Sequence, residues 1–210
     1  MAIILFDFDG VLADTLEDLV NFAREACTEM GFSREPTPAD LDALETMSFV
    51  DFGRQLQIPQ QSIEEFVNRC LRKFNQRLRP PKIFEGMEKV VRRAAKRHIL
   101  AIITGNTTPT VEAFLNEYGL REHIELVIGV EEKASRPEKI RQALSRLGNS
   151  PVSAYMVGDA LSDIRAARET AVKSIAVGWG HQNPARLATA NPDHLVNSPA
   201  DLLELLEKIH

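Results

Sequence analysis

Two pairs of aspartates in this sequence have the residue type and spacing to bind a metal ion. Asp7 and Asp9 directly follow an apolar run at the N-terminus, and Asp159 and Asp163 follow a similar run much later in the sequence. Residues two apart in an extended segment project to the same face, so Asp7 and Asp9 bring like charges close together. Such carboxylates raise each other's pKa unless a cation lies between them. Oxygen donors without clustered His or Cys favour a hard cation, and a few protein ligands completed by water favour Mg²⁺.

A single Asp at the end of a strand often caps the helix that follows. For Asp163 alone, helix capping explains the residue as well as metal binding does. For Asp7, Asp9 and Asp159 together, capping would require three coincidences, so we predict a metal site.

A third polar segment, Thr104-Gly105-Asn106, also follows an apolar run. A hydroxyl group and free N–H groups at a turn between strand and helix can hold phosphate oxygens without adding charge. Such turns are common, and this one becomes informative beside the aspartates.

The elements that would position these residues alternate along the chain. Apolar runs of strand length predict a buried parallel sheet at Ala2–Phe6, Ile99–Ile103, Leu126–Val130, Ala154–Val157 and Ser174–Val177, with a short edge strand at Leu195–Val196. Helical periodicity predicts helices at Met87–Arg97, Thr110–Tyr118, Glu138–Leu147, Ile164–Glu169 and Leu202–Ile209. This order predicts an α/β fold with a doubly wound parallel sheet, in which ligands bind beyond the carboxyl ends of the strands. The three polar clusters are therefore expected to converge.

The interval between the first two predicted strands is far longer than a strand–helix–strand unit requires. Its apolar positions recur with helical spacing, and prolines separate the segments. We therefore expect a small α-helical domain at residues 15–81, inserted into a core formed by residues 1–14 and 82–210.

The composition excludes several classes of protein. The formal net charge is −5, which offers no electrostatic attraction for a nucleic-acid backbone or an anionic membrane. The N-terminal apolar run lacks a basic leader and is too short for a signal peptide, which predicts a cytoplasmic protein. Cys27 and Cys70, outside any C-x-x-C arrangement, are expected to be buried free thiols. The sequence indicates no particular oligomeric state.

Three segments resemble signature motifs of the haloacid dehalogenase superfamily: Asp-Phe-Asp-Gly-Val-Leu from Asp7, Ile-Thr-Gly-Asn ending at Asn106, and Val-Gly-Asp-Ala-Leu-Ser-Asp ending at Asp163. The helical insertion resembles the C1-type cap of that superfamily. The tail Pro192–Leu205 is similar to the phosphoglycolate phosphatase-like branch. The resemblance covers the core from end to end, whereas the cap matches in kind only.

The resemblance implies a magnesium-dependent phosphatase that acts on a small phosphorylated metabolite, such as a phosphoglycolate-like ester or a sugar phosphate. Asp7 would attack phosphorus and form an aspartyl-phosphate, and Asp9 would serve as general acid and base. Mg²⁺ would be held by the Asp7 side chain, the Asp9 carbonyl oxygen and Asp159, with Asp163 binding the ion directly or through a water molecule. Thr104, Gly105 and Asn106 would bind the phosphoryl oxygens.

The sequence departs from the family at one catalytic position. Family members place a lysine, typically before a proline, ahead of the last motif, and here Arg136 precedes Pro137. Arginine supplies the charge and a bidentate fork, but it differs from lysine in reach. Arg136 is the expected catalytic and phosphate-binding residue, and Lys133 and Lys139 remain alternatives.

Other activities of the superfamily remain open. A phosphonatase would need a cap lysine for its imine, and Lys73 and Lys82 are candidates; a phosphomutase would return the phosphate to a sugar. A dehalogenase is disfavoured because it has no need of an acid/base at Asp9. Outside enzymes, the fold could serve as a catalytically silent phosphate-binding module, although such relatives usually lack one of the acidic groups. Arg54, Arg79 and the loop residue His181 carry no assignment, since most such residues lie on the surface.

Overall fold

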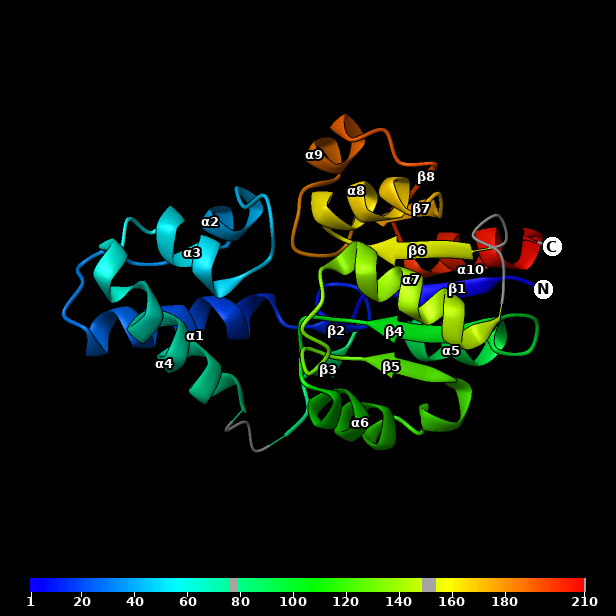
Figure 1. The fold of residues 1–210 in the computed structure, drawn as a ribbon, viewed down its shortest axis with the longest axis horizontal. Coiled ribbons are helices and arrows are strands. Elements are labelled where there is room, and N and C mark those ends of the chain that lie inside the picture. The colour runs from blue at the N-terminus through cyan, green and yellow to red at the C-terminus, as the bar shows by residue number, and fades with distance from the viewer. Residues whose placement is uncertain (76–78, 149–153, 210) are drawn as a thin grey trace.

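The computed structural model describes residues 1–75, 79–148 and 154–209. Six parallel strands form the central sheet in the order β5-β4-β1-β6-β7-β8. Their bounds are β1 Ile3–Phe6, β4 Ile99–Ile103, β5 Leu126–Ile128, β6 Ala154–Gly158, β7 Lys173–Val177 and β8 His194–Val196. The predicted doubly wound α/β fold with a helical insertion is therefore confirmed (Figure 1).

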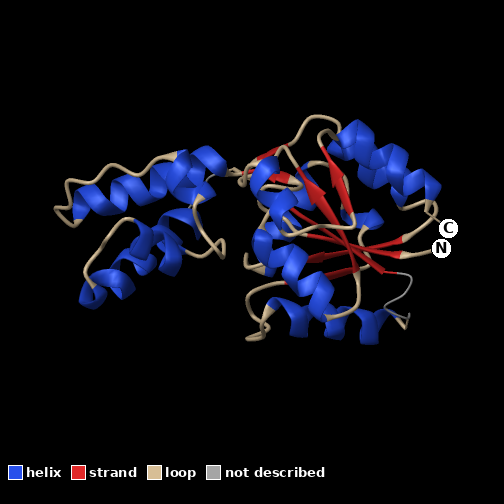
Figure 2. Cartoon of the chain, turned by 90° about the horizontal axis from the view of Figure 1, so that it is seen from above, coloured by secondary structure: helices blue, strands red, loops and turns tan. Residues whose placement is uncertain are grey.

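Strand β1 is buried on both faces, as its continuous apolar run predicts. Ile4 and Phe6 belong to one apolar cluster, and Ile3 and Leu5 belong to another. Helices cover both faces (Figure 2). In chain order they are α5 Met87–Ala94, α6 Thr108–Glu117, η2 Arg121–His123, α7 Arg136–Leu147, α8 Leu161–Glu169, α9 Pro184–Thr189 and α10 Pro199–Lys208.

The structure differs from the predicted elements mainly at helix N-termini. Helices α6, α7 and α10 each begin two or three residues earlier than predicted, because a proline occupies the first turn in all three. The predicted strand Leu126–Val130 ends at Ile128, so Val130 lies in the following loop. Helix α9 was missed, since only Leu187 of its residues is buried and it has no apolar stripe.

The insertion forms a helical cap beside the sheet (Figure 1). Its elements are α1 Leu16–Glu29, α2 Pro38–Asp42, α3 Phe49–Gln55, η1 Gln60–Ser62 and α4 Ile63–Asn75. Their apolar faces build a cluster of their own around the fully buried Phe66 and Phe52. At the surface, Lys73 of α4 makes ion pairs with Glu25 and Glu29 of α1, at 2.7 and 2.6 Å.

The cap joins the core at two places. Two short antiparallel strands, β2 Ala13–Asp14 and β3 Lys82–Ile83, form a ribbon where the chain enters and leaves the cap. A second contact comes from the buried Gln182, whose Nε2 donates to the Leu44 carbonyl of the cap while its Oε1 accepts from the Leu161 N–H of the core, both at 2.7 Å. The cap is therefore held to the core both by the β2–β3 ribbon and by the hydrogen bonds of Gln182.

None of the helices in the described part of the chain combines the length and the apolar character needed to cross a bilayer.

Both cysteines lie inside the cap, Cys27 on α1 and Cys70 on α4, and both are buried free thiols as predicted. Burial raises the pKa of Cys70 to about 12 and also raises the pKa of Cys27. At pH 8 both are therefore protonated and shielded, and only the thiolate is nucleophilic.

We predict that neither thiol of the native protein reacts with Ellman's reagent at pH 8 on the timescale in which guanidinium-unfolded protein releases two equivalents. A Leu195→Cys variant serves as the control, because Leu195 is exposed on β8 and its thiol should react promptly. Fast labelling of Cys27 or Cys70 in the native parent would contradict the packing of the cap helices.

Candidate active site

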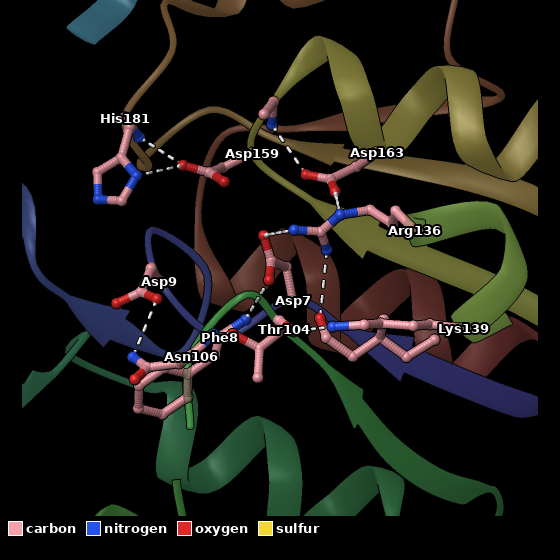
Figure 3. Close-up of polar contacts among 12 residues, drawn as sticks. Asp7, Phe8, Asp9, Thr104, Asn106, Arg136, Lys139, Asp159, Asp163 and His181 are labelled. Carbon is pink, nitrogen blue, oxygen red and sulfur yellow. Dashed lines mark hydrogen bonds and ion pairs between the residues drawn. The ribbon is translucent and has the colours of Figure 1, made fainter. Parts of the chain in front are cut away.

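Three buried carboxylates converge at the carboxyl end of the sheet. Asp7 follows β1, Asp159 follows β6, and Asp163 lies in the first turn of α8. One oxygen from each lies within 4.8 Å of the others. The strands β1 and β6 are neighbours, so their ends bring together residues that most of the chain separates (Figure 3).

Arg136 lies among these carboxylates. Its guanidinium reaches Asp7 Oδ2 at 3.1 Å and Asp163 Oδ1 at 3.0 Å, and it also donates to the Ile103 carbonyl. The residue begins α7, where a capping box between Ser135 and Glu138 fixes the first turn. Three carboxylates and one guanidinium leave a formal charge of −2 in the buried cluster.

Burial of this excess negative charge raises the pKa values of two of the carboxyl groups. Burial, together with the neighbouring Asp7 carboxylate, raises the pKa of Asp159 to about 8. Burial also raises the pKa of Asp163, although the Arg136 guanidinium opposes the shift. Burial disfavours the charge on Arg136, but Asp163 and Asp7 together raise its pKa. The guanidinium is therefore charged, whereas the acidic cluster lacks compensating positive charge.

The cluster fits a divalent cation. Asp159 Oδ1 is buried and has no hydrogen-bond partner among the described residues, while Asp159 Oδ2 accepts the His181 N–H at 2.7 Å. A metal ion would occupy the free oxygen and balance the charge of −2. Carboxylate donors alone suit Mg²⁺ and other hard cations.

Asp9 lies apart from the three clustered carboxylates. Its Oδ2 accepts a hydrogen bond from Asn106 Nδ2 at 3.2 Å, so its side chain faces the loop after β4 (Figure 3). The Asp9 carboxylate is therefore not part of the buried cluster, and it borders the cavity beside Asn106.

The predicted anion-binding turn follows β4. The Thr104 hydroxyl accepts the Asn106 N–H at 2.9 Å, which folds the turn tightly. Gly105 has open space where a side chain would project, so its backbone faces the cavity without obstruction. The backbone N–H groups of Thr104 and Asn106 already have acceptors, so the turn offers the Thr104 hydroxyl and the Gly105 N–H to a ligand in the cavity.

The three basic candidates occupy different positions. Arg136 contacts Asp7, whereas the buried Lys139 donates to the carbonyls of Thr104 and Gly129, both at 2.8 Å. Lys133 is exposed. Lys139 therefore supports the turn that carries Thr104, and Arg136 is the basic residue in direct contact with the aspartates.

His181 was left without a role in the sequence analysis, but the structure buries it in the site. Its backbone N–H and its Nδ1 both lie close to Asp159 Oδ2, at 2.7 and 3.2 Å, and its Nε2 lies 3.2 Å from the Thr15 hydroxyl. Gly10, in the left-handed region with φ of +77°, permits this packing, because a Cβ there would collide with Asp159 and His181. A single histidine in a loop belongs to no recognisable motif. Only its position after the fifth predicted strand could have indicated that His181 lies in the site.

A cavity of about 490 Å³ opens above these residues. Its floor contains Asp7, Asp9, Thr104, Asn106 and Arg136, all from the core. Its opposite wall comes from helices α1, α3 and α4 of the cap and the segment before α3. The site therefore lies between cap and core.

Residues 4–177 match the family of haloacid dehalogenase-like hydrolases. The chain belongs to this family. It is similar to the phosphoglycolate phosphatase of Synechococcus elongatus, with 28% identity over 100% of this chain and 99% of the relative. It is also similar to the pyrophosphatase PpaX of Bacillus mycoides, with 27% identity over 99% of this chain and 97% of the relative.

Solved structures of low identity share the fold of this hydrolase. A haloacid dehalogenase-like hydrolase from Streptococcus pneumoniae superposes with a TM-score of 0.87 at 21% identity, covering 98% of both chains. A hydrolase from Pseudomonas syringae superposes with a TM-score of 0.81 at 18% identity, covering 100% of this chain and 99% of that one. The predicted family and its capped fold are thus confirmed.

We predict that the metal-free hydrolase loses stability as the pH rises from about 4 to about 8. The folded-state pKa of Asp159 lies near 8, above its ordinary value, so in this window the folded state holds a proton that the unfolded state has released. The melting temperature in EDTA should therefore fall by a few degrees between pH 6 and pH 8. A metal ion held by this cluster would bind its deprotonated form, so the stabilising effect of Mg²⁺ should be larger at pH 8 than at pH 6.

The control is Asp159→Asn, which removes one of the two carboxyl groups whose pKa burial raises and should reduce both the pH dependence and the response to Mg²⁺. Thermal melts of both proteins at the two pH values provide the measurement. A magnesium effect of equal size at pH 6 and pH 8 in the parent would contradict the prediction.

Proposed function

We propose that this hydrolase is a magnesium-dependent phosphatase that cleaves a small phosphate monoester through an aspartyl-phosphate at Asp7. The observation that carries the proposal is the contact of Asp7 with Arg136 beside the buried, negatively charged cluster at the floor of the cavity. Two relatives named for phosphate hydrolysis, a phosphoglycolate phosphatase and a pyrophosphatase, support the same chemistry.

The proposed ligands for Mg²⁺ are the side chains of Asp7 and Asp159 and the backbone carbonyl of Asp9, with Asp163 binding directly or through water. When bound, the ion neutralises charge on the phosphoryl oxygens and orients the ester toward Asp7. Asp163 is held by Arg136 and by the Ala160 N–H at 3.1 Å, so it also positions the guanidinium.

Asp7 is the proposed nucleophile. Its Oδ1 accepts the Phe8 N–H at 2.8 Å and its Oδ2 meets Arg136, so both oxygens are held in place. Attack of a carboxylate oxygen on phosphorus forms the Asp7–phosphorus bond and releases the alcohol oxygen. Water then cleaves the acyl-phosphate, which frees inorganic phosphate and regenerates Asp7.

Asp9 is the proposed general acid and base. It would protonate the departing alkoxide in the first step and take a proton from water in the second. Asn106, held by Thr104, fixes the Asp9 carboxylate through its side-chain amide. The proposed phosphoryl-binding groups are the Thr104 hydroxyl, the turn at Gly105 and Asn106, and the Arg136 guanidinium.

We further propose that residues 15–81 act as a cap domain over a core of residues 1–14 and 82–210. The ribbon β2–β3 would be the hinge, since both boundaries fall at it. Cap closure excludes water from the ester during the first step.

The phosphonatase alternative has no support from the described residues that line the cavity. Lys73 makes ion pairs on the far side of α4, and Lys82 borders a different depression near Asp14. Neither can form an imine with a molecule bound above Asp7 unless the chain rearranges. No specific contact favours a phosphomutase or a silent binding module.

The experiment compares the parent protein with Asp7→Asn in the hydrolysis of p-nitrophenyl phosphate with Mg²⁺. We expect phosphate release to fall by at least about 1,000-fold, because the substitution removes the nucleophile with little change in shape. Asp201→Asn, an exposed position on α10, is the matched control and should keep parental activity. Acid-quenched parent enzyme should carry an acyl-phosphate that Asp7→Asn lacks; equal rates for these two proteins would refute the proposal.

A further inference from the structure

The cavity above Asp7 has two chemically different halves. The floor is polar and holds the aspartates, the Thr104 turn and Arg136. The cap wall carries seven apolar side chains, among them Met47, Phe49 and Phe74, and no charged residue among those described. A ligand that fills this cavity must therefore meet polar groups at one end and an apolar surface at the other.

The only polar side chain on the described cap wall is that of Ser48, and it is already engaged. Its hydroxyl caps α3 by accepting the Asp51 N–H and also contacts Asp51 Oδ2, both at 3.1 Å. The wall therefore presents no described side chain that is free to pair with an anion or to bind a sugar hydroxyl.

Several basic residues of the cap form ion pairs with acidic residues outside the cavity. Arg54 pairs with Asp51 at 3.0 Å, Arg69 pairs with Glu29 and Glu65, and Lys73 pairs with Glu25 and Glu29. None of them borders the cavity. Within the described lining, Arg136 is the sole arginine or lysine, and it is bound to Asp7 and Asp163 at the floor.

The mouth of the cavity is also apolar. Five large apolar residues in the described chain are exposed, and three of them, Val50, Leu71 and Val130, line this cavity with exposures of 36, 42 and 48%. Val50 and Leu71 belong to α3 and α4 of the cap, and Val130 follows β5 of the core. Exposed apolar side chains that gather at one opening mark a binding surface.

The apolar wall does not match the polar floor opposite, because closing it onto the floor would remove water from polar groups and replace it with apolar side chains. A molecule with a phosphate at one end and an apolar group at the other satisfies both halves. A carboxylate or a second phosphate in place of the apolar group would be buried against apolar side chains.

We infer that the substrate is a phosphate monoester whose alcohol is apolar and uncharged, rather than one bearing a carboxylate or a second phosphate. The inference rests on the proposed phosphatase activity and adds the class of its leaving group. The inferred substrate differs from the substrates after which the two relatives, phosphoglycolate phosphatase and pyrophosphatase, are named.

The test compares isobutyl phosphate with phosphoglycolate. The two molecules have a similar shape, but isobutyl phosphate carries a branched apolar group where phosphoglycolate carries its carboxylate. We expect kcat/KM with Mg²⁺ to be about tenfold or more higher for isobutyl phosphate, because the carboxylate of phosphoglycolate would face apolar side chains on the cap wall. Along the series ethyl, butyl and hexyl phosphate, kcat/KM should rise about fourfold for each added methylene until the cavity is filled. Pyrophosphate should be a poorer substrate than butyl phosphate.

A variant pair tests the assignment of the wall. Leu71→Arg places a cation at the mouth on an exposed helical position, where arginine is well tolerated. It should lower the preference for isobutyl phosphate over phosphoglycolate by about tenfold or more, because a charge-assisted contact becomes available. Leu195→Arg makes the same change at a residue of similar exposure on β8 and should leave the preference unchanged.

Two failures are distinguishable. If p-nitrophenyl phosphate is hydrolysed but phosphoglycolate or pyrophosphate matches or exceeds isobutyl phosphate in the parent, the inference about the leaving group is overturned and the phosphatase activity stands. An unchanged preference in Leu71→Arg overturns it as well. If no monoester is hydrolysed, p-nitrophenyl phosphate included, the proposed function itself fails and the inference falls with it.

Discussion

The structure of this hydrolase depends on a charge imbalance that the fold creates at one edge of its sheet. Asp7, Asp159 and Asp163 are buried together, and the Arg136 guanidinium pairs with Asp7 and Asp163. Buried like charges repel each other strongly where little water screens them. A divalent cation would balance this charge, so the property that costs the metal-free fold stability is the one on which the proposed catalysis depends.

The sheet topology is what makes this arrangement possible. Strand β1 lies between β4 and β6, so the polar segments that follow three neighbouring strands open onto one space. The tight packing around Asp159, which Gly10 permits, brings His181 against the same carboxylate. The Thr15 hydroxyl, at the entrance to α1, contacts the other side of the His181 ring. Thr15, where the chain enters the cap, is thus linked through His181 to Asp159.

Much of the fold and part of the candidate site could be predicted from the sequence. Strands buried on both faces are continuous apolar runs, and the insertion shows helical periodicity, so both were found without tertiary information. The segments around Asp7, Thr104 and Asp159 were recognisable because each follows such a run. Their positions at strand ends are local properties of the chain, which explains why one sequence suffices for them.

The parts that were missed depend on contacts between distant segments. Gln182 binds the cap through Leu44, and nothing in its neighbouring residues indicates a partner so far away in the chain. The apolar character of the cap wall is also a tertiary property, because Val50, Leu71 and Val130 come from three separate elements. Each looks like an ordinary apolar residue in its own segment, and only the packing of cap against core brings them to one opening.

The most direct test of the central claim is a crystal structure of the protein grown with Mn²⁺ in place of Mg²⁺ and measured at the manganese absorption edge. The account predicts one strong anomalous peak within about 2.0 to 2.5 Å of carboxylate oxygens of both Asp7 and Asp159. A peak elsewhere, or the absence of any peak between these residues at saturating Mn²⁺, would contradict it.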